Sequence, residues 1–123
     1  MLRKLTLAVV LTTLVAVTPA SAQKAGPNGG MLAGKAGHET ELVISPAELT
    51  VFLIDDGKSH STKSVAMKAV IQEGGKNTAL TFVDVDGKKL VAKLAAPVGK
   101  GAIIVLTGKD DHGDAVSARY VVN

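Results

Sequence analysis

Seven short apolar runs, each about as long as a strand, alternate with turn-forming residues between positions 42 and 122. β-branched residues are frequent in these runs and favour strands over helices. Asp-Gly and Gly-Gly pairs, which are usual centres of two-residue β-hairpins, separate several of them. The pattern predicts an all-β fold: a single antiparallel β-sandwich of about seven strands and immunoglobulin-like type, with a small barrel as the alternative. The runs cover residues 42–44, 49–54, 65–71, 79–85, 89–94, 102–107 and 115–122.

Two of the runs leave a structural choice open. Residues 65–71 (VAMKAVI) have a composition that also suits a helix, but their short length between hairpin signals favours a strand. A two-residue turn at Asp86-Gly87 would pair Val85 with Lys88 and leave both faces of that ribbon partly apolar. Either the ribbon is covered on both sides or a bulge shifts its register. If Phe82 is exposed, it forms with Val91 a surface suited to a partner.

The N-terminus has the composition of a secretory signal peptide. Arg3 and Lys4 precede an apolar run over residues 5–17, and small residues lead to a predicted cleavage site after Ala22. The apolar run is short for a membrane span, so we expect cleavage rather than an uncleaved anchor, and no membrane span in the mature form. This assigns residues 1–22 to a signal peptide and predicts an exported, periplasmic protein.

Composition limits the function of the remaining 101 of the 123 residues, which we divide into a flexible lead-in (23–30) and one β-sandwich domain (31–123). Without Arg3 and Lys4, 12 basic residues face 11 acidic ones, and no basic patch with aromatic residues appears. This charge balance argues against nucleic-acid binding. The chain has no cysteine and therefore neither disulfides nor thiolate chemistry.

Potential metal ligands gather in three short stretches. Each has a plain structural interpretation as well, since acidic residues form solvated strand faces and Asp, His and Gly suit turns. Alternation along a strand places Glu39 and Glu41 on one face and His38 on the other, so that His38 needs a partner from another segment. The three groups are His38, Glu39 and Glu41; Asp55, Asp56 and His60; and Asp110, Asp111, His112 and Asp114.

Motifs for catalysis are absent from the sequence. It contains no G-x-S-x-G nucleophile elbow and no H-E-x-x-H zinc motif. A sandwich of about 100 residues also has little room for a deep substrate pocket. The sequence therefore predicts a protein that is not an enzyme.

The arrangement P-N-G-G, then G-H-x-x-E-L-V, then a strand of type LTVFL followed by D-G-K resembles a family of small periplasmic β-sandwich proteins. Such domains accompany heavy-metal efflux systems of the resistance-nodulation-division type, and some form the N-terminal part of periplasmic adaptor subunits. Family members often have a histidine two positions before the glutamate, where this chain has Glu39. The matching positions are Pro27, Gly29, Gly30, His38, Glu41, Leu42 and Val43.

The resemblance implies an exported binding module linked to metal homeostasis or efflux, whose partners would be periplasmic components of an efflux system. A site of histidine and carboxylate would suit zinc or copper, as a divalent or cuprous ion, better than calcium. The alternative function is a protein-interaction sandwich of the cell envelope that has no metal site. The residues predicted to bind metal are His38, Glu39, Glu41, Asp111 and His112.

Overall fold

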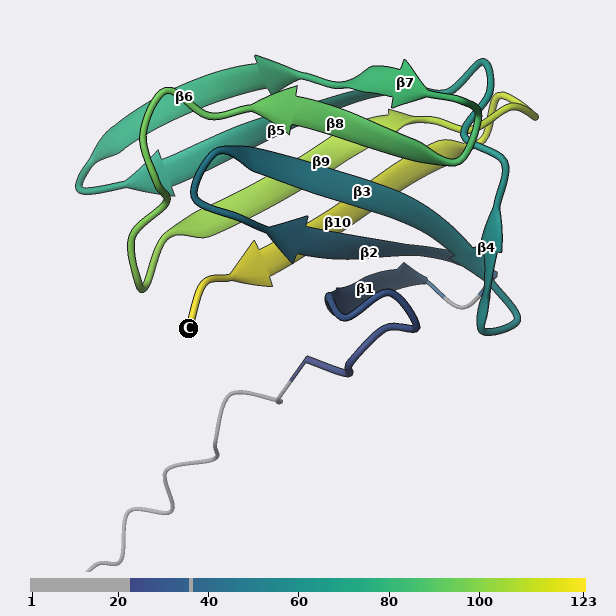
Figure 1. Cartoon of the computed structure of the whole chain (residues 1–123), viewed down its shortest axis with the longest axis horizontal. Helices are drawn as coiled ribbons and strands as arrows, with labels where there is room; N and C mark the ends of the chain where they lie inside the picture. Colours follow the sequence, from purple (N-terminus) through teal and green to yellow (C-terminus); the bar gives the residue numbers. More distant parts are fainter. Residues whose placement is uncertain (1–22, 36) are drawn as a thin grey trace, which may run out of the picture.

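A computed structural model describes residues 23–35 and 37–123, so the predicted signal peptide lies outside the described residues. This part of the chain folds into ten strands and no helix, and the strands form two antiparallel sheets that pack face to face (Figure 1). The prediction of an antiparallel all-β fold is confirmed. Over the same residues, no helix has the length and apolar character needed to cross a membrane.

The first sheet has six strands in the order β1-β2-β3-β8-β7, and β4 also pairs with β3. β8 pairs with the first half of β3 and β4 with its last residues, so the two lie on the same side of β3 one after the other. The bounds are Met31–Lys35 for β1, His38–Ile44 for β2, Glu48–Asp55 for β3, Lys58–His60 for β4, Val83–Val85 for β7 and Lys89–Lys93 for β8.

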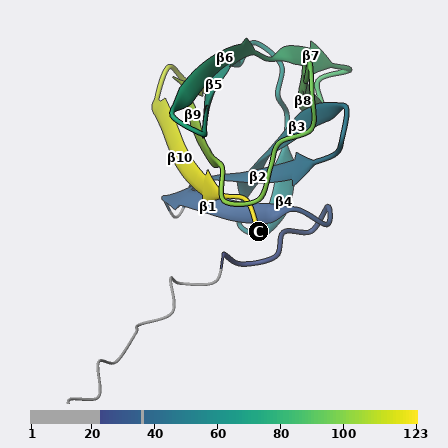
Figure 2. The same cartoon turned by 90° about the vertical axis from the view of Figure 1, so that its left-hand side faces the viewer.

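The second sheet has four strands in the order β10-β9-β5-β6. Figure 2 shows the two sheets facing each other, with β7 continuing from β6 at one side and β1 lying beside β10 at the other. The ambiguous run at residues 65–71 is a strand, as expected. The bounds are Ala66–Glu73 for β5, Lys76–Thr81 for β6, Ile103–Lys109 for β9 and Ala115–Val121 for β10.

The hairpin turns follow the residue pairs that predicted them. Asp56 and Gly57 connect β3 to β4, and Gly74 and Gly75 connect β5 to β6. All four have positive φ, at 54°, 75°, 57° and 75° respectively. Positive φ at both central residues is what a type I′ turn requires, and this turn matches the right-handed twist of the paired strands.

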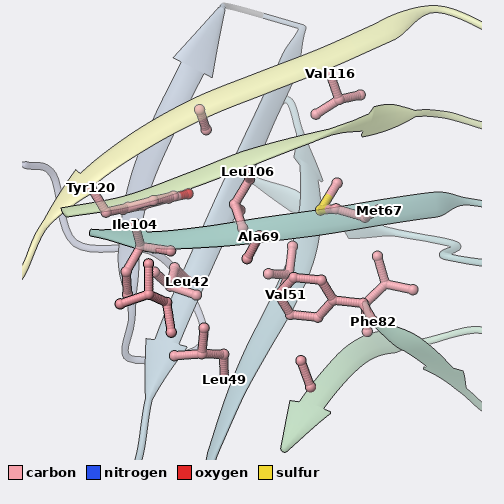
Figure 3. Packing of buried hydrophobic residues seen from close by; sticks show 14 of the residues in the cluster. Leu42, Leu49, Val51, Met67, Ala69, Phe82, Ile104, Leu106, Val116 and Tyr120 are labelled. Carbon is pink, nitrogen blue, oxygen red and sulfur yellow. The ribbon is translucent and has the colours of Figure 1, made fainter. Parts of the chain in front are cut away.

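Side chains from both sheets form one core, which Figure 3 shows in close view. Aliphatic residues dominate it, and Phe82 and Tyr120 supply the buried aromatic rings. In β10 the alternation predicted from sequence holds, since Val116, Ala118 and Tyr120 are buried while Arg119 between them is exposed. The core residues are Leu42, Leu49, Val51, Met67, Ala69, Ile71, Phe82, Leu90, Ala92, Ala102, Ile104, Leu106, Val116, Ala118 and Tyr120.

The buried Tyr120 hydroxyl connects the two sheets. It donates a hydrogen bond to the Thr40 carbonyl oxygen at 2.7 Å and lies 2.6 Å from Oγ1 of Thr40, whose hydroxyl is free to donate in return. Burial raises the pKa of the Tyr120 hydroxyl, and the negative charge of Glu41 raises it further, although the hydrogen bond with Thr40 opposes them. The hydroxyl therefore stays neutral inside the fold.

The run at residues 79–85 is divided between the sheets. The Phe82 amide still donates to the Met67 carbonyl at 3.1 Å, in register with β5 and β6, but Val83 pairs with Val91 of β8 in the other sheet. Phe82 points into the core and Val83 is 67% exposed. The expectation that Phe82 could line an outer surface is therefore wrong, because the chain changes sheets at this residue.

The Asp86-Gly87 hairpin has the bulged register rather than the simple one. Val85 pairs with Lys89 instead of Lys88, while the Lys88 amide donates to the Val85 carbonyl at 3.0 Å and closes the turn. Lys88 is thus the extra residue of a bulge. The shift places Leu90 in the core and leaves Val91 on the outer face beside Val83.

Candidate metal-binding cleft

A cleft of about 170 Å³ lies where the β1–β2, β3–β4 and β9–β10 connections meet at one end of the molecule. His38, His60 and His112, which are all the histidines of the chain, line this cleft. They come from sequence positions far apart, so only the folded arrangement of the three hairpins brings them together. The same cleft contains several carboxylates.

His38 is the first residue of β2 and faces the β9–β10 loop. Its Nδ1 lies 3.5 Å from Oδ2 of Asp110. The His38 side chain is 46% exposed, whereas that of Asp110 is only 10% exposed. The pair therefore lies at the boundary between the fold and solvent, where an ion can reach the imidazole nitrogen.

Asp110 organises the loop that follows β9. Its Oδ1 accepts the backbone amides of His112 at 3.0 Å and Asp114 at 2.8 Å, and its own amide donates to the Asp114 carbonyl at 3.0 Å. Aspartate favours such turns because its short side chain bonds the backbone two residues on. Gly113, at a φ of 79°, supplies the positive φ that the loop needs. With Oδ1 occupied in this way, Oδ2 is the oxygen that faces His38.

His38, Asp110 and Asp114 form a group of three potential metal ligands. One imidazole nitrogen and one oxygen from each carboxylate all lie within 4.8 Å of one another. Two segments, the start of β2 and the β9–β10 loop, supply the donors. An imidazole and two carboxylates are donors that Zn²⁺ accepts, and three protein ligands leave coordination positions for water or a further donor.

Two more histidine–aspartate pairs line the cleft. Nε2 of His60 lies 3.4 Å from Oδ2 of Asp55 across the β3–β4 hairpin, and Nε2 of His112 lies 3.6 Å from Oδ1 of Asp111. All four side chains are about half exposed or more, and His112 is the most exposed at 79%. They add nitrogen and oxygen donors to the lining of the cleft.

Glu41 occupies a different environment. Its side chain is fully buried, and the loop at residues 26–30 encloses its carboxylate. The Asn28 amide donates to both oxygens at 3.1 and 2.8 Å, Nδ2 of Asn28 donates to Oε1 at 3.0 Å, and the Gly30 amide donates to Oε2 at 2.8 Å. We call this arrangement of residues 26–30 around Glu41 the Glu41 clamp. A buried carboxylate is stable only when its oxygens have such partners.

The clamp requires glycine at positions 26 and 30, because a side chain there would collide with β2. A Cβ atom at Gly26 would lie 2.2 Å from Cδ of Glu41, and one at Gly30 would lie 2.5 Å from the Leu42 carbonyl oxygen. The Gly26 amide also donates to the Gly30 carbonyl at 2.8 Å and closes the loop. The segment predicted as a flexible lead-in thus makes specific hydrogen bonds with β2.

The structure places four of the five residues predicted to bind metal at the cleft: His38, Glu39, Asp111 and His112 line it. Of these, His38 belongs to the three-ligand group, while Glu41 is held in the clamp. The interpretation of Glu39 and Glu41 as a solvated strand face is wrong for Glu41, which is buried. Sequence reasoning noted Asp110, Asp114, Asp55 and His60 but did not select them, because nothing in the order of residues shows which hairpin ends meet.

Comparisons of this chain with models of protein families, with curated proteins and with solved structures gave no match.

Proposed function

We propose that this protein is a non-enzymatic metal-binding module that holds one divalent ion between His38, Asp110 and Asp114. The observation that supports this function best is the approach of the three ligand atoms to within 4.8 Å of one another. The meeting of all three histidines at the same cleft adds to it. His60, His112 and Asp111 would then supply further donors.

The donor set favours Zn²⁺ or Cu²⁺. Imidazole nitrogen suits both ions, and carboxylate oxygen is a common zinc ligand. Cuprous ion prefers soft thiolate and thioether ligands, but the chain has no cysteine, Met67 is buried in the core, and Met31 is not among the residues that line the cleft. We therefore expect divalent zinc or copper rather than Cu⁺.

A calorimetric titration with Zn²⁺ tests this function. We expect saturable binding that His38→Ala abolishes and Asp110→Asn weakens, since the asparagine retains Oδ1 for the loop but removes the charge at the ligand position. Glu48→Gln, at the first residue of β3 and outside the cleft lining, is the matched carboxylate-to-amide variant and should bind zinc as the wild type does. Equal affinity in wild type and His38→Ala would contradict the proposal.

The small volume of the cleft supports binding rather than catalysis. Pockets that enclose a small-molecule substrate usually measure about 300–1,000 Å³, whereas this one measures about 170 Å³. A bound ion needs far less space than a substrate does. We therefore propose that this cleft holds an ion and is not an active site.

We further propose that the protein is exported to the periplasm, that its fold is immunoglobulin-like, and that it works with components of a heavy-metal efflux system. The composition of residues 1–22 and the P-N-G-G…G-H-x-x-E-L-V resemblance support this proposal. Cell fractionation with N-terminal sequencing of the protein tests export, and the expected first residue is Gln23. Full-length protein retained in the cytoplasm would contradict it.

A second candidate function is protein binding through the outer face of the first sheet. Val83 is 67% exposed and pairs with Val91, so two apolar side chains lie next to each other on that face. A capture experiment from envelope extract with wild type and Val83→Lys tests it. A partner lost only in Val83→Lys supports this function, and identical recovery by both proteins contradicts it.

A further inference from the structure

The side-chain amide of Asn28 connects two separate parts of the fold. Its Nδ2 donates to Oε1 of Glu41 at 3.0 Å and to Oγ of Ser59 at 3.0 Å. An asparagine amide has two N–H donors, so both are used, one on the clamp and one on β4. The Asn28 backbone amide also donates to Glu41, which fixes the position from which the side chain reaches Ser59.

β4 has few other contacts: it pairs with β3, and His60 lies opposite Asp55 of that strand. The strand consists of three exposed residues and pairs with β3 alone, through Leu53, Ile54 and Asp55. Short edge strands with exposed backbone hydrogen bonds open at low free-energy cost. The Asn28–Ser59 hydrogen bond at the centre of this strand therefore gives it a second point of attachment, separate from the His60–Asp55 pair.

Alternation along β4 places its side chains on two sides. Ser59 points towards the clamp, where Asn28 binds it, and His60 points to the opposite side, where it lines the cleft. A contact on one side of the strand thus sets the position of the imidazole on the other side.

We propose that Asn28 is a positioning residue for the cleft: through Ser59 it holds β4 against the Glu41 clamp and thereby keeps His60 at the mouth of the metal site. The part that concerns metal rests on the function proposed above. In this arrangement the N-terminal segment acts on the cleft without supplying a ligand. The buried carboxylate of Glu41 is the anchor, and the two amide hydrogens of Asn28 are the link.

Amide hydrogen exchange in the metal-free protein tests the link directly. Ser59→Ala removes the acceptor on β4 and leaves the clamp intact, and we expect exchange at residues 58 and 60, whose amides face β3, to become roughly fivefold faster, which is the factor that one net hydrogen bond contributes. Ser117→Ala, at an exposed position on β10, is the matched control and should leave both rates unchanged. Unchanged rates in Ser59→Ala would overturn the proposal.

A zinc titration of four proteins tests the consequence for the cleft. Ser59→Ala should lower the affinity of the otherwise wild-type protein and have no effect when His60→Ala is also present, because its effect passes through His60. An equal loss in both backgrounds would show that Ser59 acts on the whole domain and would overturn the role assigned to His60.

The two experiments separate this proposal from the proposed function. Faster exchange at β4 in a protein that binds no zinc would refute the metal site and leave the link between Asn28 and β4 standing. Zinc binding with unchanged exchange at β4 would support the metal site and refute the link between Asn28 and β4. Asn28→Asp, compared with the charge-matched Asn77→Asp on β6, gives an independent check, since the aspartate loses both side-chain N–H donors; we expect faster exchange at β4 in Asn28→Asp only.

Discussion

Glu41 is the residue that gives the P-N-G-G stretch its shape. A carboxylate at this depth would be strongly unfavourable without partners, and the clamp supplies two backbone amides and one side-chain amide. Hydrogen bonds to a charged acceptor are worth more than neutral ones. The shape of the loop and the burial of Glu41 therefore depend on each other. The Asn28 and Gly30 amides reach the carboxylate because the loop folds back on β2.

We expect Glu41→Gln to lower the free energy of unfolding by about 2–3 kcal/mol, because the amide turns an N–H₂ group towards donors that need an acceptor. Urea denaturation of the wild type and the variant measures this difference. Glu39→Gln, two residues earlier on the same strand and only half-buried, serves as the control and should change stability by no more than about 0.5 kcal/mol. Equal losses in both variants would argue against a special role for the clamp.

At the cleft, the sequence did not show that His38 and Asp110 lie close together. Asp110 and His38 are 72 positions apart in the chain and meet because the β1–β2 and β9–β10 connections lie at the same end of the fold. Periodicity could place His38 at a strand start and Asp110 in a turn. It could not show that the two turns adjoin, because that depends on how the two sheets pack.

At the scale of elements, the strands with a regular apolar pattern were predictable. β3, β5, β8, β9 and β10 lie within two residues of the predicted runs at each end. β1 was not predicted as a strand, since MLAGK contains Gly34 at a φ of 104°, and the polar segment that contains β4 was compatible with either a loop or an edge strand, since KSH has no apolar residue. Both strands form by pairing with a neighbouring strand, and neither has the apolar alternation that predicts a strand from sequence.

The junction of β6 and β7 predicts losses of stability of very different size for substitutions at two adjacent residues. Phe82→Ala should cost about 3–5 kcal/mol of unfolding free energy, since it leaves a cavity between the sheets. Val83→Ala should cost no more than about 0.5 kcal/mol, because its side chain is largely exposed. Thermal or chemical denaturation of both variants checks this contrast, and a larger loss for Val83 would mean that the chain changes sheets elsewhere.

At the scale of the whole molecule, the Tyr120 hydroxyl is a buried polar link between two sheets whose shared core consists mainly of aliphatic side chains. Its partner Thr40 lies in β2 of the first sheet, and Tyr120 itself lies in β10 of the second. We expect Tyr120→Phe to lower stability by about 1–2 kcal/mol at pH 7, because the buried Thr40 hydroxyl and carbonyl lose a partner. Denaturant unfolding measures it, and a gain in stability would contradict this role.

The raised pKa of Tyr120 also predicts how stability changes in alkali. The unfolded chain releases this proton near the ordinary value of 10.0, whereas the folded protein retains it to higher pH. Stability due to Tyr120 is therefore fully present below pH 10 and falls as the pH rises above it, by up to about 1.4 kcal/mol per pH unit. Unfolding curves of wild type and Tyr120→Phe should converge between pH 10 and 12, and parallel pH profiles would show that the hydroxyl titrates normally in the fold.

The link between β2 and β10 has a consequence for when the protein can fold. Thr40 and Tyr120 are 80 residues apart, and Gln23, whose side-chain amide donates to the Arg119 carbonyl, is 96 residues from it. A ribosome delivers the chain from its N-terminus, so the early strands emerge well before the strand that completes their packing, and pairings over such distances form slowly. A partly synthesised chain therefore lacks the partners that complete its sheets, and it stays open until β10 has emerged.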